Sequence, residues 1–366
     1  MASRFKKCTL HIGTEKTGTT SLQQFLKINR DALKAQGFFV PAQMGPSEHV
    51  DLVCLFAGTD KRFSRRKRLG MNTAAAVEAH KVDLADRIGS ELAANAHPER
   101  SLLISSERLG TVINNDDEVL ALREFLLRYC EEVEIVAYIR PQHEFAISMY
   151  STVLKTGSSS ASCLPPVDES SAAARVYYYD KLLDFWRASF PDSTITVRRF
   201  QRSELVDGDT TKDFSAAVGI DASELRAPKA LNRSLSAEAQ LFLRHMNQHI
   251  PKPNTAAGKP SRGDINKILE RHFAGAGYLP SKRAAKEFYD QFAESNERTR
   301  NAWFPDRETL FDLSFEKYPD EENESVLSLD DAFAMFAKVY EIHNRRLQKL
   351  RSTLAEAEDA RSIQPQ

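Results

Sequence analysis

The residues of this chain that are best suited to chemistry lie together in one short stretch near its start. The stretch is a loop with two glycines, one lysine and a series of hydroxyl side chains: Gly13, Thr14, Glu15, Lys16, Thr17, Gly18, Thr19, Thr20 and Ser21. Glycines let a backbone approach an anion closely, and the orphan N–H groups and dipole at a helix start favour negative charge. The loop therefore predicts a binding site for a phosphate or sulfate group.

The residues on either side of this loop predict the elements that present it. An apolar run from Leu10 to Ile12 leads into the loop and predicts a strand. Beyond it, apolar residues recur at helical spacing, at Leu22, Phe25, Leu26 and Leu33. We therefore expect a strand, the loop and then a helix whose start faces the anion.

Two further polar sites each follow a predicted strand. Ser106 and Glu107 come directly after the apolar run 101–105, and Arg140 follows the run 134–139. In a parallel sheet the ends of these strands meet at one edge, which is where ligands bind. The loop, Glu107 and Arg140 are therefore expected to share a cleft.

The alternation of strand and helix patterns predicts an α/β fold with a mostly parallel central sheet flanked by helices. Further strands are expected at 38–41 and 194–197, and helices at 74–96, 117–129 and 177–190. We expect three parts, namely an α/β core over 1–226, a helical lobe over 227–350 and a polar, frayed tail over 351–366.

Composition narrows the class of protein. The 366 residues include 50 basic and 51 acidic side chains, so no overall positive field points to nucleic acid. The four cysteines form no CxxC pair, which argues against zinc and against a disulfide framework. No apolar run is long enough to span a membrane, and the first strand begins too early for a signal segment. We expect a soluble, cytoplasmic protein.

The sequence also contains a basic run at 61–68 and three histidines near the predicted site elements. The run is taken as a solvated surface segment, with contact to an acidic substrate as the alternative. His11 lies mid-strand and is read as a core residue, and His143 as a helix-start residue. His49 is a candidate base or acceptor contact, with an ordinary surface histidine as the alternative.

The loop differs from the usual nucleotide-binding P-loop, in which a lysine directly follows the second glycine. Here Thr19 occupies that position and the lysine lies inside the loop, at Lys16. A triphosphatase also needs an acidic residue at a strand end to organise Mg²⁺, and Glu107 has no acidic residue beside it. The pattern favours a less charged transferred group and no metal.

The stretch from Ile12 to Gln23 resembles the 5′-phosphosulfate-binding loop of sulfotransferases that use 3′-phosphoadenosine 5′-phosphosulfate (PAPS), with the family's Lys-[Ser/Thr]-Gly-Thr-Thr motif at Lys16 to Thr20. That family has a P-loop-like α/β fold. Its second signature, an arginine followed eight residues later by a serine, is matched by Arg140 and Ser148. By resemblance these two side chains would bind the 3′-phosphate of the donor.

The resemblance also implies a catalytic base and a branch of the family. The base follows the strand that precedes the arginine strand, which is the position of Glu107; an ion pair or a helix cap is the alternative role, and His49 is the second candidate base. The segment 178–186 resembles bacterial carbohydrate-type members. The glycine- and lysine-rich C-terminal loop of the cytosolic branch has only a loose counterpart at 258–263.

The function implied is transfer of a sulfuryl group from PAPS to a hydroxyl, on a carbohydrate or glycoconjugate, leaving adenosine 3′,5′-bisphosphate. Two alternatives stay open. One is a Mg²⁺-dependent kinase or triphosphatase with a degenerate loop, and the other is an inactive nucleotide- or glycan-binding protein. The acceptor and the oligomeric state cannot be read from the sequence.

Overall fold

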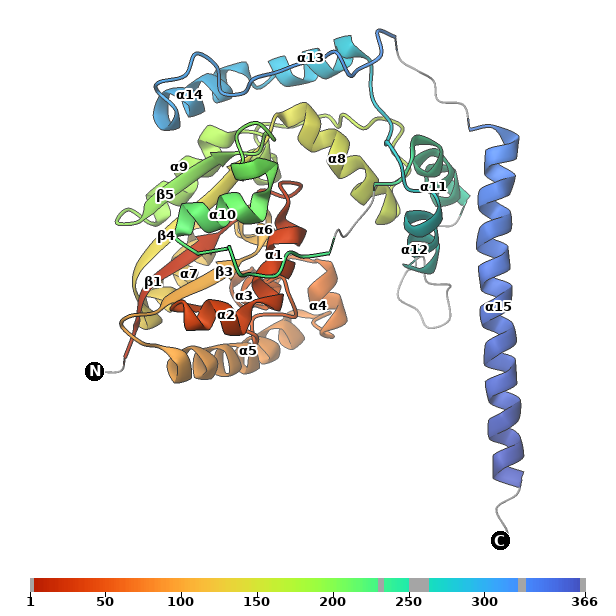
Figure 1. Ribbon diagram of the computed structural model, residues 1–366, viewed down its shortest axis with the longest axis horizontal. Helices are drawn as coiled ribbons and strands as arrows, with labels where there is room; N and C mark the ends of the chain where they lie inside the picture. The colour runs from red at the N-terminus through yellow and green to blue at the C-terminus, as the bar shows by residue number, and fades with distance from the viewer. Residues whose placement is uncertain (1–2, 230–233, 250–262, 322–326, 363–366) are drawn as a thin grey trace. The chain divides into compact units, whose positions relative to one another are not determined.

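The computed structural model describes residues 3–229, 234–249, 263–321 and 327–362. These residues form two compact units (Figure 1). The first comprises Met1–Phe145, Pro166–Leu231 and Glu287–Ser314, and the second comprises Ala146–Pro165, Asn232–Lys286 and Phe315–Gln366. The loop at 258–263, considered above as a counterpart of a family loop, lies outside the described residues apart from Gly263.

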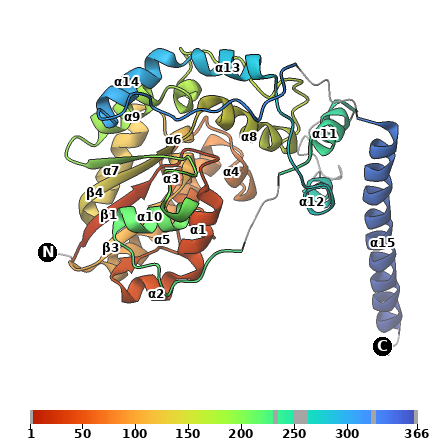
Figure 2. The ribbon, with the colours of Figure 1, turned by 45° about the horizontal axis from the view of Figure 1, so that its top comes forward.

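A parallel sheet of five strands organises the first unit. Its order is β2-β3-β1-β4-β5, and every neighbouring pair is parallel. Figure 2 labels the central strands β3, β1 and β4. The strands are β1 (Phe5–His11), β2 (Phe38–Phe39), β3 (Ser101–Ser105), β4 (Cys130–Ile139) and β5 (Thr194–Arg199). The predicted fold class, a mostly parallel sheet flanked by helices, is confirmed.

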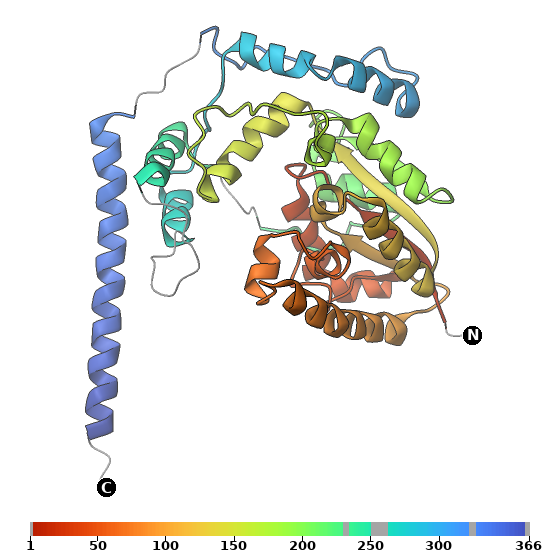
Figure 3. The same ribbon diagram turned by 180° about the vertical axis from the view of Figure 1, so that it is seen from behind.

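Helices cover both faces of this sheet, as a parallel sheet requires. The helices wholly within the first unit are α1 (Thr19–Ile28), α2 (Arg30–Ala35), α3 (Val50–Phe56), α4 (Ser64–Arg68), α5 (Ala74–Asn95), α6 (Glu107–Val112), α7 (Asp116–Tyr129), α9 (Tyr179–Ser189), α10 (Thr210–Val218) and α14 (Ala293–Trp303). Alternate residues of β4 point to opposite faces: Ile135 packs with α5 and α7, whereas Val136 and Tyr138 pack with α1 and α10. Figures 1 and 3 show these two faces.

The second unit is helical. It contains α11 (Ala237–His249), α12 (Gly263–His272) and α15 (Leu329–Ser362), and its core includes Leu154, Leu243 and Leu269. Helices α8 (Gln142–Lys155) and α13 (Lys282–Asp290) each have residues in both units. α15 includes residues 351–362, for which the sequence predicts a frayed tail. The domain boundary near residue 226 stays a prediction.

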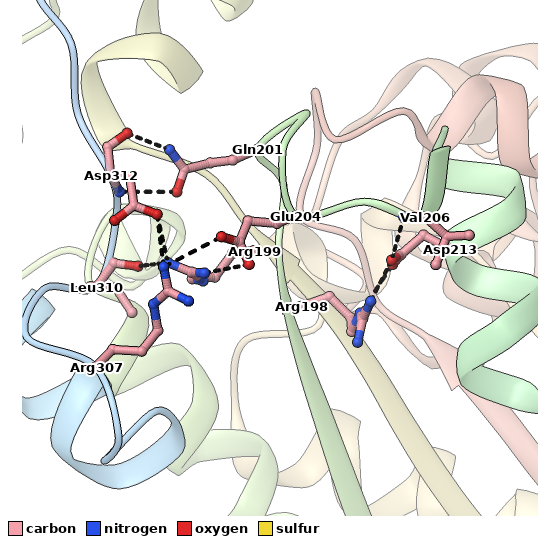
Figure 4. A network of polar contacts seen from close by, with 9 residues as sticks. All are labelled: Arg198, Arg199, Gln201, Glu204, Val206, Asp213, Arg307, Leu310 and Asp312. Atoms are coloured by element: carbon pink, nitrogen blue, oxygen red, sulfur yellow. Dashed lines mark hydrogen bonds and ion pairs between the residues drawn. The ribbon is translucent and has the colours of Figure 1, made fainter. Parts of the chain in front are cut away.

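Residues 287–314, which we call the returning segment, belong to the sheet unit although they follow the second unit's helices in sequence. The Arg199 guanidinium at the end of β5 is buried, donates to the Leu310 carbonyl at 3.1 Å and pairs with Glu204 (Figure 4). The Gln201 amide exchanges two hydrogen bonds with the Asp312 backbone, at 2.7 and 3.2 Å. Charged and polar contacts from β5 therefore hold the returning segment in place.

The basic run at 61–68 is partly structural, which corrects the expectation of a solvated segment. Arg66 is only 1% exposed. Its guanidinium donates to the carbonyls of Cys54 and Ala57, at the end of α3, and to those of Gly58 and Lys61. The four C-terminal carbonyls of a helix lack partners within it, so a buried arginine can satisfy them. The sequence pattern missed this because burial depends on contacts outside the run.

This role of Arg66 predicts a selective loss of stability. Replacing Arg66 with Met leaves several buried carbonyls without donors, and we expect the free energy of unfolding to fall by about 3 kcal/mol. The exposed neighbour Arg68 provides the control, because Arg68→Met removes the same charge from the same helix. Urea denaturation of both variants checks this, and equal midpoints would contradict the buried role.

Candidate functional site

The ends of three neighbouring strands bring the predicted polar sites to one edge of the sheet. β1 lies between β3 and β4, and His11 is level with Ser105 on one side and Val136 on the other. The loop after β1, Glu107 after β3 and Arg140 after β4 therefore leave the sheet side by side. Their convergence follows directly from the parallel register.

Backbone hydrogen bonds hold the loop against the end of β4. Tyr138 N–H donates to the Gly13 carbonyl at 2.6 Å, and Thr14 N–H donates back to the Tyr138 carbonyl at 2.8 Å. Gly13 has a φ of +96°, and a Cβ there would lie 2.9 Å from Glu107 Cβ. Only glycine combines that backbone with this close approach, so Glu107 lies directly against the start of the loop.

The start of α1 offers unpaired N–H groups. Gly18, with a φ of +79°, is its N-cap and supplies no side-chain cap. Leu22 N–H makes the first bond within the helix, to the Gly18 carbonyl at 3.1 Å. The N–H groups of Thr19, Thr20 and Ser21 therefore have no acceptor within α1, which is the usual basis of anion binding at a helix start.

Within the loop, the hydroxyl residues divide between structural and accessible positions. Thr17 is fully buried, and its hydroxyl donates to the Thr14 carbonyl at 2.6 Å. Thr14 is itself buried and donates its hydroxyl to the Tyr138 carbonyl at 3.0 Å. Thr20, in contrast, is exposed. The first two hydroxyls thus brace the loop, and Thr20 remains available for a ligand.

Arg140 lies against the same loop. Its Nη1 donates to the Lys16 carbonyl at 3.0 Å, and its Nε lies 3.2 Å from a Glu144 oxygen. The guanidinium also lies 5.4 Å from the centre of the Phe200 ring. A phosphate bound here would share the guanidinium with Glu144. Ser148, the predicted second contact, lies on the part of α8 that belongs to the second unit, and its pairing with Arg140 stays a prediction.

Glu107 is the first residue of α6, immediately after the N-cap Ser106. Its Oε2 accepts a hydrogen bond from Gln23 Nε2 of α1 at 2.5 Å. The contact links the helix that follows the loop to the helix that follows β3. Gln23 therefore positions the Glu107 carboxylate beside the loop.

His49, the second candidate base, is a buried structural residue. The residue is 1% exposed. The imidazole Nδ1 accepts a hydrogen bond from the Ser105 backbone N–H at 3.0 Å, and the backbone N–H of His49 donates to the Ser105 carbonyl at 3.1 Å. Burial, with help from the Arg30 charge, lowers the pKa of His49 to about 3. These hydrogen bonds give His49 a structural role beside β3, and its role as a base stays a prediction. His11 is also a core residue, with its pKa lowered to about 3 by burial.

The residue that sequence reasoning missed is the neighbour of His49, Glu48. Its carboxylate accepts from Ser106 Oγ at 3.2 Å and lies 3.9 Å from Arg108 Nε. Arg108 also lies 3.4 Å from Glu15. We call Glu15, Glu48 and Glu107, with Arg108 among them, the carboxylate cluster.

Electrostatics within the carboxylate cluster favour proton exchange near neutral pH. Burial, and next the Glu107 charge, raise the pKa of Glu48 to about 7, although Arg108 and the Ser106 hydroxyl oppose the rise. Burial also raises the pKa of Glu15, against the opposing Arg108 charge. Carboxylates this close cannot all ionise at ordinary pH without cost. The cluster therefore can hold and release a proton in the range where a general base works best.

A local signal for Glu48 was present in the sequence. The signal for Glu48 is its position next to His49, just before the apolar start of α3. The ordinary pKa of histidine is near neutral, which makes His49 the more obvious candidate of the two. In the fold His49 takes the buried side and Glu48 faces the cluster.

Three observations bear on metals, thiols and membranes. Among the described residues, no group of three or more His, Cys, Asp or Glu side chains has an arrangement that could hold a metal ion. All four cysteines are buried and free of disulfides. The helices of the described ranges include none that is both long and apolar enough to cross a membrane.

Comparison with known proteins gives few relatives. No protein-family model matches the chain. Over 209 residues it is 29% identical to an uncharacterized protein of Archaeoglobus fulgidus, and the alignment covers 56% of this chain and 54% of that protein. The chain therefore spans about half the length of that relative.

Two of the solved structures that resemble the chain are sulfotransferases, each at 13% identity. One is a sulfotransferase from Alicyclobacillus acidocaldarius, with a TM-score of 0.43, covering 80% of this chain and 94% of that one. The other is the sulfotransferase domain of the Synechococcus PCC 7002 olefin synthase, with a TM-score of 0.32, covering 80% and 96%. At such low TM-scores neither likeness bears on the activity of this chain.

The raised pKa of Glu48 predicts an unusual pH dependence of stability. The folded state keeps a proton between an ordinary carboxyl pKa of 4.5 and about 7, whereas the unfolded state releases it. The wild type therefore loses stability as pH rises through this window, and Glu48→Gln escapes the loss. We expect the variant to gain about 2–3 kcal/mol on the wild type between pH 4.5 and pH 8. Urea titrations across this range measure it, and a flat difference would contradict the assignment.

Proposed function

We propose that the chain is a sulfotransferase that moves a sulfuryl group from PAPS to a hydroxyl, on an acceptor of the carbohydrate class. The observation that carries the proposal is the convergence, at one sheet edge, of an anion-binding loop, two cations and a carboxylate cluster. The motifs at Lys16 to Thr20 and at Arg140 and Ser148 support PAPS as the donor. The fold class is compatible with this proposal but does not by itself decide the reaction.

The residues of the loop suit the 5′-phosphosulfate end of such a donor. The N–H groups of Thr19, Thr20 and Ser21 are unpaired within α1, and the helix dipole adds to their attraction for an anion. Lys16 supplies the cation that stabilises charge on the leaving oxygen. When bound, the donor supplies an activated sulfuryl group whose leaving group is a phosphate.

Arg140 suits the 3′-phosphate, because guanidinium offers paired donors to phosphate oxygens. Its carbonyl accepts from the Tyr179 hydroxyl, and its Nη1 is tied to the loop. These contacts hold Arg140 in place beside the loop. Glu144, which now pairs with Nε, is expected to weaken binding unless it moves aside.

Glu107 is the residue proposed to take the proton from the acceptor hydroxyl. It lies against Gly13, and Gln23 holds one of its oxygens. The charge of Glu107 contributes to the raised pKa of Glu48. We propose that Glu48 accepts the proton that Glu107 removes from the acceptor.

A Mg²⁺-dependent kinase or triphosphatase is the second candidate. The observation in its favour is the spacing of Gly13 and Gly18, which is that of the usual P-loop. Against it stands Thr19 at the position of the usual P-loop lysine. A non-catalytic nucleotide- or glycan-binding protein remains the third.

The donor assignment predicts how two cation variants behave. We expect Arg140→Ala to weaken binding of adenosine 3′,5′-bisphosphate at least tenfold, because a charge-assisted hydrogen bond contributes about 1.5–3 kcal/mol. Lys16→Ala should abolish turnover. The exposed Arg128 on α7 is a matched control, and Arg128→Ala should bind as the wild type does. If Arg140→Ala and Arg128→Ala bind equally, Arg140 does not contact the nucleotide.

The base assignment predicts a loss of rate without a loss of donor binding. Glu107→Gln should lower kcat about 10²-fold or more, while affinity for the bisphosphate nucleotide is retained. Transfer of labelled sulfate, screened against glycans and small phenols, measures the rate. Wild-type turnover that survives in Glu107→Gln would overturn the role of Glu107. A wild type that transfers nothing to any acceptor, yet binds the nucleotide, would favour the non-catalytic alternative.

A further inference from the structure

Helix α15 carries a row of exposed apolar side chains. They are Leu329, Phe333, Phe336, Tyr340, Leu347, Leu350 and Leu354, each between 50% and 76% exposed. Among the described residues these are seven of the ten large hydrophobic side chains that are exposed. The rings of Phe336 and Tyr340 stack at 6.2 Å. We call this row the apolar stripe.

The apolar stripe has the spacing of a coiled-coil seam. Its members, with His343 between Tyr340 and Leu347, alternate at steps of four and three residues from Leu329 to Leu354. That average of about 3.5 residues is the repeat that keeps one helix face against a partner helix. The stripe runs for nearly four heptads, which is the length at which such a pattern indicates a coiled coil.

The stripe is not the face by which α15 packs within its own unit. Met335 is buried in the core of the second unit, with residues of α11 and α12. Met335 lies at neither of the two seam positions of the heptad. The unit therefore uses one side of α15 and leaves the seam uncovered.

We propose that the apolar stripe binds the same stripe of a second copy of this chain, as an antiparallel two-helix coiled coil. In one alignment Leu329 faces the partner's Leu354, and Phe336 faces the partner's Leu347. Tyr340 then faces the partner's His343 on either side of the dyad axis. All eight seam positions of each copy have a partner in this alignment, and a shift by one heptad would leave some uncovered.

Charged residues beside the seam favour antiparallel pairing of the two helices. Asp330 and Arg351 flank the seam on the same side of α15. In the antiparallel pair each Asp330 faces the partner's Arg351, which gives an opposite-charge contact at both ends. In a parallel pair Arg346 would face the partner's Arg351 twice, and like charges at these positions oppose pairing. The sequence thus favours one direction and disfavours the other.

The first test is the mass of the full-length chain in solution. Sedimentation equilibrium at about 10 μM should give a dimer. Leu347→Glu, which puts a charge in the seam, should raise the dissociation constant at least a hundredfold. Gln348 is the next residue, is exposed and lies outside the seam. Gln348→Glu adds the same charge there and should leave the dissociation constant unchanged. A monomeric wild type at 100 μM, or equal effects of the two variants, would overturn the proposal.

The second test determines the direction. A mixture of Leu329→Cys chains and Leu354→Cys chains should form a mixed disulfide, whereas each variant alone should not crosslink. Arg351→Asp should weaken the dimer about tenfold, and adding Asp330→Arg should restore it. A parallel dimer would give the reverse: self-crosslinking of each cysteine variant and a tighter dimer with Arg351→Asp. The native cysteines are buried and leave the readout clear.

Discussion

The candidate site depends on the parallel pairing of β1 with β3 and β4, which continues beyond the strand itself. Ile12 N–H bonds the Val136 carbonyl at 3.0 Å, and Gly13 and Thr14 exchange hydrogen bonds with Tyr138. On the other side, Gly110 N–H of α6 reaches the Ile12 carbonyl at 3.2 Å, and a Cβ at Gly110 would lie only 2.7 Å from that oxygen. The loop is therefore held by hydrogen bonds on both sides. These bonds fix the loop relative to the ends of β3 and β4, and so relative to Glu107 and Arg140.

The loop region separates opposite charges over a short distance. Arg140 lies at the end of β4, where an anion would be stabilised, and the carboxylate cluster lies around the loop and the end of β3. This separation of cationic and anionic groups suits a reaction between an anionic donor and a hydroxyl that must lose a proton. The cationic groups would bind the donor, and the carboxylates would accept the proton. The protonation of Glu48 limits the repulsion among the carboxylates of the cluster near neutral pH.

Local pattern was enough to predict the strands, most helices and the edge of the sheet where the loop, Glu107 and Arg140 meet. It failed where a side chain's environment is made by distant segments. The sequence does not single out Glu48 beside His49, because the burial of His49 against β3 cannot be read from the residues themselves. The buried role of Arg66 and the return of residues 287–314 to the sheet unit likewise depend on contacts between segments remote in sequence.

The central claim is that the loop and Arg140 together hold a 3′-phosphorylated nucleotide. Isothermal titration of the full chain with adenosine 3′,5′-bisphosphate in a metal-free buffer, and with Mg·ATP in parallel, tests it most directly. We expect one site per chain for the bisphosphate. Its binding should need no metal, and its affinity should clearly exceed that of Mg·ATP. Binding of Mg·ATP alone would contradict it and would favour a kinase or triphosphatase.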